Sequence, residues 1–119
     1  MTDDEILDAY VDALGAADAG AVRRLIAPGA VMWHNFDQVD RDIDASLGQL
    51  AAMADRLADM QMEVVERFAL DDGIGIRLVL KGTNRATGVT FESHQAMFFR
   101  IAEERITRIQ EYVAPGGLS

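Results

Sequence analysis

The spacing of apolar residues changes once along this chain, and that change constrains the fold more than any other feature. Up to about residue 59, apolar side chains recur at intervals of three or four residues, which predicts amphipathic helices. From Met62 onward they alternate with polar residues, which predicts strands. Helices followed by a run of strands favour an α+β domain, in which the helices pack on one face of a curved antiparallel sheet.

Local signals mark the ends of three predicted helices. Thr2 and Glu5 form a capping-box pair in front of a helix over residues 3–15. Asp18 can cap a second, shorter helix that ends before the Pro-Gly pair at 28 and 29. A run of alternate aspartates favours the start of a third helix, over roughly residues 41–59. The inward residues of the second helix are predicted to be Val22, Leu25 and Ile26.

Strands are predicted for most of the remaining chain. A short strand over residues 30–37 separates the second and third helices. A hairpin then runs from residue 62 to residue 80, and strands follow over residues 89–101 and 105–113. Residues 114–117 are predicted to form a loose tail. In the first strand of the hairpin, the alternation places one set of apolar side chains on the inner face: Met62, Val64, Phe68 and Leu70.

The length and charge of the chain restrict the number of domains and the kinds of partner that can be expected. With 119 residues, the chain is expected to form a single domain over residues 1–119. Its net charge of -9, without a basic patch interleaved with aromatic residues, argues against a nucleic-acid partner. The acidic N-terminus and the absence of a long apolar run predict a cytoplasmic protein that does not bind membranes. Because there is no cysteine, thiol nucleophiles and thiolate metal sites are excluded.

The strand over residues 30–37 holds the single tryptophan and one of the two histidines. Alternation puts Met32, His34 and Phe36 on one face, and Trp33 and Asn35 on the other. An imidazole on such an apolar strand needs a partner, because a buried polar group without one costs about 1–3 kcal/mol. His34 is therefore either a core histidine tied to backbone or carboxylate, or a functional group, and imidazole exchanges protons near neutral pH.

The order of these elements, the tryptophan-containing strand between the second and third helices, and the ending Ile106-x-x-Ile109-x-Glu111-Tyr112 resemble the nuclear transport factor 2-like superfamily. Within it, the resemblance is to SnoaL-like and ketosteroid-isomerase-like proteins. It implies a cone-shaped sheet with three helices on its concave face, a hydrophobic pocket, and frequent dimers. Members include isomerases, dehydratases, cyclases and hydrolases, and also binders without catalytic activity, so the fold alone does not choose a function.

Some site residues of the ketosteroid isomerases carry over to this chain. Tyr10 matches the tyrosine that binds the substrate oxyanion, and His34 stands where the family has its carboxylate base. The second oxyanion donor of that family, a protonated aspartate, matches Met97 or Ala96, and neither side chain can donate a hydrogen bond. This departure argues against steroid isomerisation by the family's mechanism.

The last strand adds a second candidate acid–base group. The ending from Gln110 to Pro115 resembles the phenazine biosynthesis A/B proteins, in which a glutamate at the position of Glu111 lies in the ligand pocket. Alternation places Glu111 on the same face as the aliphatic residues Ile109 and Val113, which favours a pocket over solvent. On the preceding strand, the same argument predicts that Gln95 points inward and His94 outward, although a catalytic His94 stays open as an alternative.

These residues lead to one main hypothesis and one alternative. The main hypothesis is a cofactor-independent acid–base enzyme that acts on a small, largely apolar organic molecule, with His34, Glu111 and Tyr10 as its catalytic residues. No metal site is expected, because the two histidines lack any ligand spacing. The alternative is a binding module or dimeric interaction protein of the same fold. Ligand contacts are expected from Asn35, Trp33, Met32, Gln95, Met97 and Ile109.

A homodimer is expected through the outer face of the sheet, opposite the pocket. By strand alternation, four apolar side chains point to that outer face and would form an exposed patch in a monomer: Val65, Val79, Phe98 and Tyr112.

Overall fold

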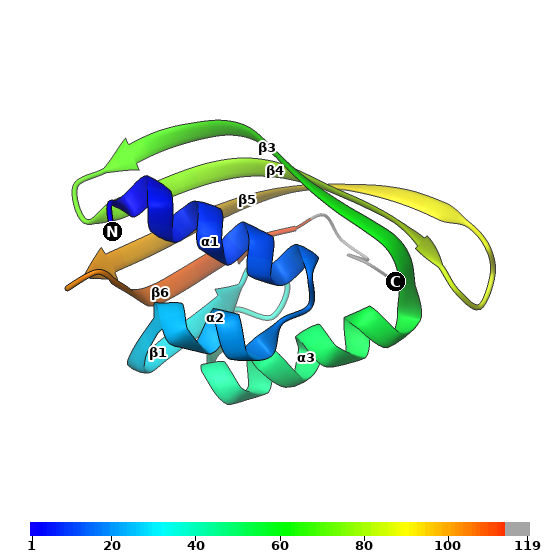
Figure 1. Cartoon of the computed structure of the whole chain (residues 1–119), viewed down its shortest axis with the longest axis horizontal. Helices are drawn as coiled ribbons and strands as arrows, with labels where there is room; N and C mark the ends of the chain where they lie inside the picture. The colour runs from blue at the N-terminus through cyan, green and yellow to red at the C-terminus, as the bar shows by residue number, and fades with distance from the viewer. Residues whose placement is uncertain (114–119) are drawn as a thin grey trace.

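The computed structural model describes residues 1–113, and within them three helices and six strands form one α+β unit (Figure 1). The elements in chain order are α1 (Asp3–Gly15), α2 (Ala19–Leu25), β1 (Ile26–His34), β2 (Asp40–Asp42), α3 (Ile43–Arg56), β3 (Leu57–Leu70), β4 (Gly73–Asn84), β5 (Thr90–Ala102) and β6 (Arg105–Tyr112). The predicted tail at residues 114–117 lies outside the described residues. Within residues 1–113, no helix combines the length and apolar character needed to span a bilayer.

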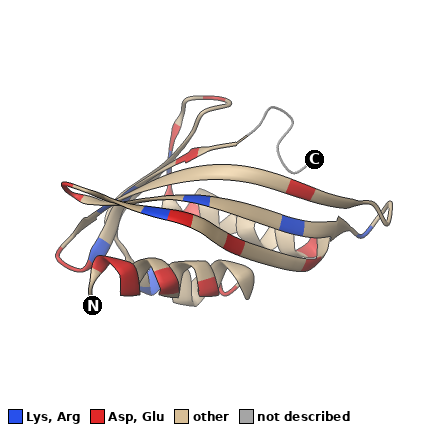
Figure 2. Cartoon of the chain, turned by 90° about the horizontal axis from the view of Figure 1, so that it is seen from above, with Lys and Arg blue, Asp and Glu red and all other residues tan. Residues whose placement is uncertain are grey.

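Helix α1 has the predicted ends. The Thr2 hydroxyl accepts a hydrogen bond from the Glu5 backbone N–H at 3.2 Å, and the Glu5 carboxylate accepts one from the Thr2 N–H at 2.9 Å. Both bonds satisfy N–H groups that the first turn of a helix leaves free. Its inner stripe, Ile6, Leu7, Tyr10 and Ala13, is buried against the sheet. Its outer side is rich in carboxylates, which Figure 2 shows as red segments along the helix.

Helix α2 is capped by Asp18 as predicted, but it ends one residue earlier than the apolar spacing suggests. Ile26, which was expected on its inner face, has extended backbone angles and begins β1. Pro28 explains the difference, because a proline disfavours helical angles in the residue before it and has no N–H to donate. Ile26 is still buried in the core, now as a strand residue.

Helix α3 is shorter than the predicted range of 41–59. It begins after Asp42, whose carboxylate accepts a hydrogen bond from the Ala45 N–H at 3.0 Å, and it ends at Arg56. The carbonyl of Arg56 accepts a bond from the Arg85 N–H in the β4–β5 turn at 2.9 Å. Leu57 then pairs with Asn84 as the first residue of β3, so sheet pairing takes over where the helical spacing alone would continue.

The six strands form one curved, open sheet in the order β2-β1-β6-β5-β4-β3. Strand β1 pairs with β6 in parallel, and every other neighbouring pair is antiparallel. The predicted α+β class is confirmed, with one parallel pair in the sheet. In Figure 1, α1 and α2 lie in front of the sheet and α3 runs beside it into β3. The helices therefore cover the concave face, and no helix within residues 1–113 covers the other face of the sheet.

Strand β3 contains a bulge that reverses the predicted side-chain alternation. Val64 pairs with Leu78, but Glu66 pairs with Arg77, so Val65 is an extra residue. Beyond it, Phe68 pairs with Gly75 and its ring contacts Phe98 on the outer face. The prediction that Phe68 and Leu70 share a face with Met62 and Val64 was therefore wrong.

A row of aromatic rings lies on the outer face of the sheet. Trp33 contacts Tyr112 with ring centroids 5.3 Å apart, Tyr112 contacts Phe98 at 5.8 Å, and Phe98 contacts Phe68 at 5.8 Å. We call Trp33, Tyr112, Phe98 and Phe68 the outer aromatic row. Its residues come from four strands, and the row passes over Gly75 of β4 between Phe98 and Phe68. Tyr112 is 42% exposed, so the row gives the outer face an apolar surface.

Candidate functional site

A cavity of about 590 Å³ lies between the helices and the concave face of the sheet. This volume is in the range of small-molecule sites. Apolar side chains form most of its wall, and the polar groups reach it from α1, α3 and three adjacent strands. The lining residues are Tyr10, Leu14, Val22, Met32, His34, Phe36, Ile43, Ser46, Leu47, Gln49, Leu50, Ala52, Met53, Arg56, Met62, Leu80, Gln95, Met97, Glu111 and Val113.

His34 and Glu111 lie beside each other on the wall of this cavity. They are register partners across the parallel strands β1 and β6, and their side chains point to the concave face. His34 Nε2 lies 3.4 Å from Glu111 Oε2, and the His34 residue is only 6% exposed. A carboxylate at this distance stabilises an imidazolium and orients the imidazole ring.

The second ring nitrogen of His34 has no such partner. Nδ1 is buried and makes no hydrogen bond to any residue among positions 1–113. The ring of Phe36 packs against the imidazole, with centroids 4.9 Å apart and the planes inclined by 33°. Of the two readings of His34, the core histidine with both ring nitrogens tied is therefore not what is found, because Nδ1 has no hydrogen-bond partner among the described residues.

The turn after His34 is held in place by its own bonds. The Gln38 N–H donates to the His34 carbonyl at 2.9 Å, and the Val39 N–H donates to Asp37 at 3.1 Å. Asp37 also forms an ion pair with Arg41. The Arg41 guanidinium, helped by the Val39 N–H and by the nearby His34, holds the pKa of Asp37 below its usual range. This turn fixes Phe36, which is 61% exposed, at the edge of the cavity.

Tyr10 reaches the cavity from α1. Its ring is buried and packs edge-on against Phe99, with centroids 5.1 Å apart and planes inclined by 71°. Burial raises the pKa of the phenol, and the negative charge of Glu111 raises it further. The hydroxyl therefore stays protonated and available as a hydrogen-bond donor.

Two residues of β5 complete the inner wall. Gln95 and Met97 are buried and line the cavity, together with Met32 of β1. The Gln95 side-chain amide donates to the Ser93 hydroxyl at 3.4 Å. His94 points to the opposite face, where it lies 3.3 Å from Glu92 in an exposed pair. The predicted inward Gln95 and outward His94 are thus confirmed, and His94 is outside the cavity.

Three residues predicted to contact a ligand do not line the cavity. Trp33 stands on the outer face against Tyr112, as the alternation of β1 requires. The Asn35 amide is used by the backbone of Val113, donating to its carbonyl at 3.1 Å and accepting from its N–H at 2.9 Å. Ile109 points inward but is covered by the core. These three predictions were wrong as statements about the cavity wall.

Helix α3 forms part of the cavity wall, although none of its residues was predicted to belong to the site. Ser46, Gln49, Met53 and Arg56 line the cavity beside the apolar stripe of that helix. The stripe itself was recognisable from its spacing, but which flanking residues face the cavity depends on how the helix is rotated over the sheet. Among the described residues, no group of three or more His, Asp or Glu side chains is arranged to hold a metal ion.

The comparisons with known proteins agree with this architecture. IdmH from Streptomyces antibioticus, a proposed polyketide cyclase, matches with a TM-score of 0.89 at 21% identity, over 99% of this chain and 96% of that chain. A ketosteroid-isomerase-like protein from Catenulispora acidiphila, solved in complex with trimethylamine, matches with a TM-score of 0.84 at 19% identity, over 98% of this chain and 91% of that chain. Identities this low establish a common fold only. No curated protein matches the chain.

A family model matches most of the sequence. The model of the SnoaL-like domain covers residues 7–109, which include α2, α3, most of α1 and nearly all of the sheet. The match takes in Tyr10, His34 and Gln95 of the cavity, whereas Glu111 lies just beyond it. The chain therefore belongs to the family of SnoaL-like domains.

Proposed function

We propose that this protein is a cofactor-independent acid–base enzyme that acts on a small, largely apolar organic molecule bound in the cavity. The observation that carries the proposal is the His34–Glu111 pair, which lines an otherwise largely apolar cavity with its nitrogen and oxygen 3.4 Å apart. A base positioned in such a cavity can accept a proton from a weakly acidic C–H or O–H group of a ligand.

Each polar group has a defined role in this proposal. His34 accepts the proton and becomes an imidazolium, which the carboxylate of Glu111 stabilises. The electrons of the broken bond move onto an oxygen of the substrate, and the Tyr10 hydroxyl donates a hydrogen bond to that oxygen. His34 then returns the proton at another position of the substrate. Return of the proton to another carbon gives an isomerisation. In an elimination the proton goes to the oxygen of a departing hydroxyl group, and in a ring closure the carbanion attacks a second carbonyl carbon of the substrate, whose oxygen takes the proton.

A second candidate function is a binding module without catalytic activity. The methionines in the cavity wall and the apolar lining favour the retention of an apolar ligand whether or not it reacts. The trimethylamine bound to the Catenulispora relative is consistent with a pocket of this fold that takes a small organic molecule. The two functions differ in whether His34 exchanges a proton with the bound molecule.

The test is proton exchange, which does not require the natural substrate to be known. A panel of cyclic ketones and aromatic carbonyl compounds is incubated with the protein in D₂O, and deuterium incorporation next to the carbonyl is followed by NMR. The enzyme hypothesis predicts accelerated exchange with at least one compound that binds. His34→Ala should slow it by about 10²–10⁴-fold, the usual contribution of a positioned base.

A matched histidine variant serves as the control. His94→Ala removes an imidazole that also lies beside a carboxylate, but on the exposed face, and it should leave exchange unchanged. Compounds that bind without any accelerated exchange would support the binding module. Near-normal exchange in a folded His34→Ala variant would overturn the role of His34.

A further inference from the structure

The cavity has a charged group at each of two distant positions. Glu111, beside His34, is the only acidic residue of its wall, and Arg56 is the only arginine or lysine of that wall among the described residues. Arg56 is the last residue of α3, whereas Glu111 is near the end of β6. Most of the lining residues between them are apolar, including Met53, Met62 and Leu80.

The strand register separates these two groups. Glu111 pairs with Met97, which pairs with Ile76 of β4. Leu57, which follows Arg56, pairs with Asn84 at the other end of β4. The eight steps from Ile76 to Asn84 correspond to roughly 26 Å along a strand. The curvature of the sheet and the length of the arginine side chain shorten the direct path, but the acid–base pair and Arg56 line the cavity from backbone positions that the strand register keeps well apart.

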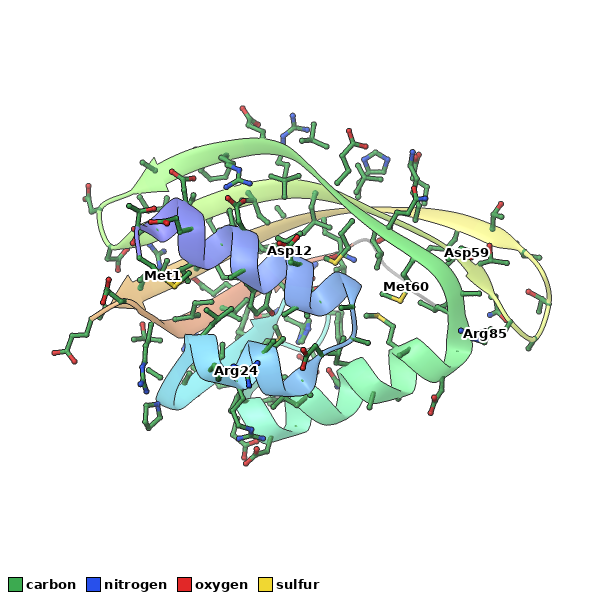
Figure 3. All side chains as sticks on the ribbon, in the orientation of Figure 1. Met1, Asp12, Arg24, Asp59, Met60 and Arg85 are labelled. Carbon is green, nitrogen blue, oxygen red and sulfur yellow. The ribbon has the colours of Figure 1, made fainter. Side chains whose placement is uncertain are left out.

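The backbone around Arg56 is tied to the sheet. Its carbonyl accepts from the Arg85 N–H at 2.9 Å, and the Arg85 side chain donates to the Leu57 carbonyl at 3.1 Å. Figure 3 shows the labelled Asp59, Met60 and Arg85 around this junction of α3 and β3. These bonds anchor the end of the helix, so the position from which the guanidinium extends is fixed.

The charge of Arg56 is not used by an ion pair within residues 1–113. The neighbouring Asp55 and Asp59 are exposed and do not pair with it. Several other arginines of this acidic chain are each bound to a carboxylate: Arg23, Arg41, Arg67, Arg77, Arg100 and Arg108. An arginine without a carboxylate partner on the wall of an apolar cavity is suited to an anionic group of a ligand.

We infer that Arg56 determines specificity by binding a carboxylate of the substrate, and that the substrate is an elongated apolar molecule with its carboxylate at the end remote from the reacting carbon. This inference rests on the proposed function for the reacting end, which lies at His34 and Glu111. The guanidinium binds the carboxylate through paired hydrogen bonds, and the methionine-rich wall accommodates the apolar part between the two ends.

The experiment compares one ligand in a charged and an uncharged form. The probes are 11-(dansylamino)undecanoic acid and its methyl ester, and binding is followed by dansyl fluorescence at low ionic strength. The natural chain should bind the acid about fivefold more tightly than the ester, because an exposed guanidinium adds a modest charge-assisted contact. This preference should decline at 1 M salt, where the screening length is about 3 Å.

Three variants identify the residue responsible. Arg56→Gln should remove the preference for the acid and leave ester binding unchanged, whereas Arg56→Lys should keep most of it. Arg24→Gln is the matched control, because Arg24 also lies in the last turn of a helix but outside the cavity wall. It should retain the full preference.

The outcomes separate this inference from the proposed function. Equal binding of acid and ester to the natural chain, or a preference that survives Arg56→Gln, overturns the role of Arg56 and leaves the acid–base proposal standing. Failure of both probes to bind contradicts the elongated ligand class itself. If no His34-dependent exchange is found but the protein still binds the acid more tightly than the ester, the enzyme hypothesis is overturned and the carboxylate site stands.

Discussion

His34 and Glu111 are directly paired residues of two parallel strands, β1 and β6, and this register brings their side chains to 3.4 Å on the concave face of the sheet. Neighbouring strands hold their residues at fixed spacing, so the geometry of the pair is set by backbone hydrogen bonds. A change of either side chain should therefore alter the chemistry of the cavity without moving the other.

Glu111→Gln should lower the exchange rate with a ligand that reacts, because it removes the charge that stabilises the imidazolium of His34. Deuterium exchange followed by NMR at pH 7 measures the rate. Glu92→Gln, which removes the carboxylate beside the exposed His94, should leave the rate unchanged. A normal rate in Glu111→Gln would contradict the coupling of the two groups.

Tyr10→Phe should lower the exchange rate by about 10²-fold, the lower end of what one donor to a developing oxyanion contributes. The ring that packs against Phe99 is kept, so the thermal midpoint should change little. Because burial and Glu111 raise the pKa of Tyr10, no activity limb from its ionisation is expected below strongly alkaline pH. A Phe variant that unfolds at lower temperature but exchanges at the normal rate would assign Tyr10 a packing role instead.

Asp37→Asn should destabilise the protein at neutral pH and have little effect in strong acid. The Arg41 guanidinium lowers the pKa of Asp37 in the folded state, so the carboxylate contributes stability above its ordinary pKa of about 4. That contribution is lost as the pH falls through the lowered value. Urea unfolding at pH 7 and pH 2 measures the difference. In an Arg41→Gln background, Asp37→Asn should have much less effect, and a full effect there would exclude the ion pair as the cause.

Gly75→Ala should destabilise the protein by about 1–3 kcal/mol, the usual cost of overpacking. A Cβ at Gly75 would lie 2.1 Å from a ring carbon of Phe68, which the bulge in β3 turns onto the same face. Gly48→Ala in α3 is the control, because a Cβ there meets no atom within 4 Å. It should stabilise the helix by about 0.5–1 kcal/mol. Chemical denaturation of both variants makes the comparison, and equal effects would contradict the close packing at Phe68.

The outer aromatic row is expected to form the interface of a homodimer, because it gives an uncovered face of the sheet an apolar surface. Light scattering at micromolar concentration should give twice the monomer mass of 13.0 kDa. Phe98→Lys should give a monomer. Val89→Lys, at an exposed apolar residue in the turn before β5, should not. A monomeric natural chain would contradict this expectation.

Several features of the molecule could be predicted from the sequence because they depend on neighbours in the chain. The Thr2–Glu5 capping box and the Asp18 cap involve residues three positions apart. Alternation within β1 placed His34 and Trp33 on opposite faces, since the direction of side chains along a regular strand is a local property. These local signals, together with the change of apolar period, indicated the fold class and an inward Gln95. Tyr10 and His34 were implied as site residues by the resemblance to known families, and Glu111 by a resemblance together with the alternation of the last strand.

The tertiary structure decided what depends on partners far along the chain. The bulge at Val65 reverses the faces of Phe68 and Leu70, and its position follows from pairing with β4. The side-chain amide of Asn35 is hydrogen-bonded to the backbone of Val113 and does not line the cavity. Arg56 lines the cavity from the end of α3, where the next residue, Leu57, pairs with Asn84 of the distant strand β4. Local periodicity states which side of an element is apolar, but register and packing against distant strands determine what that side faces.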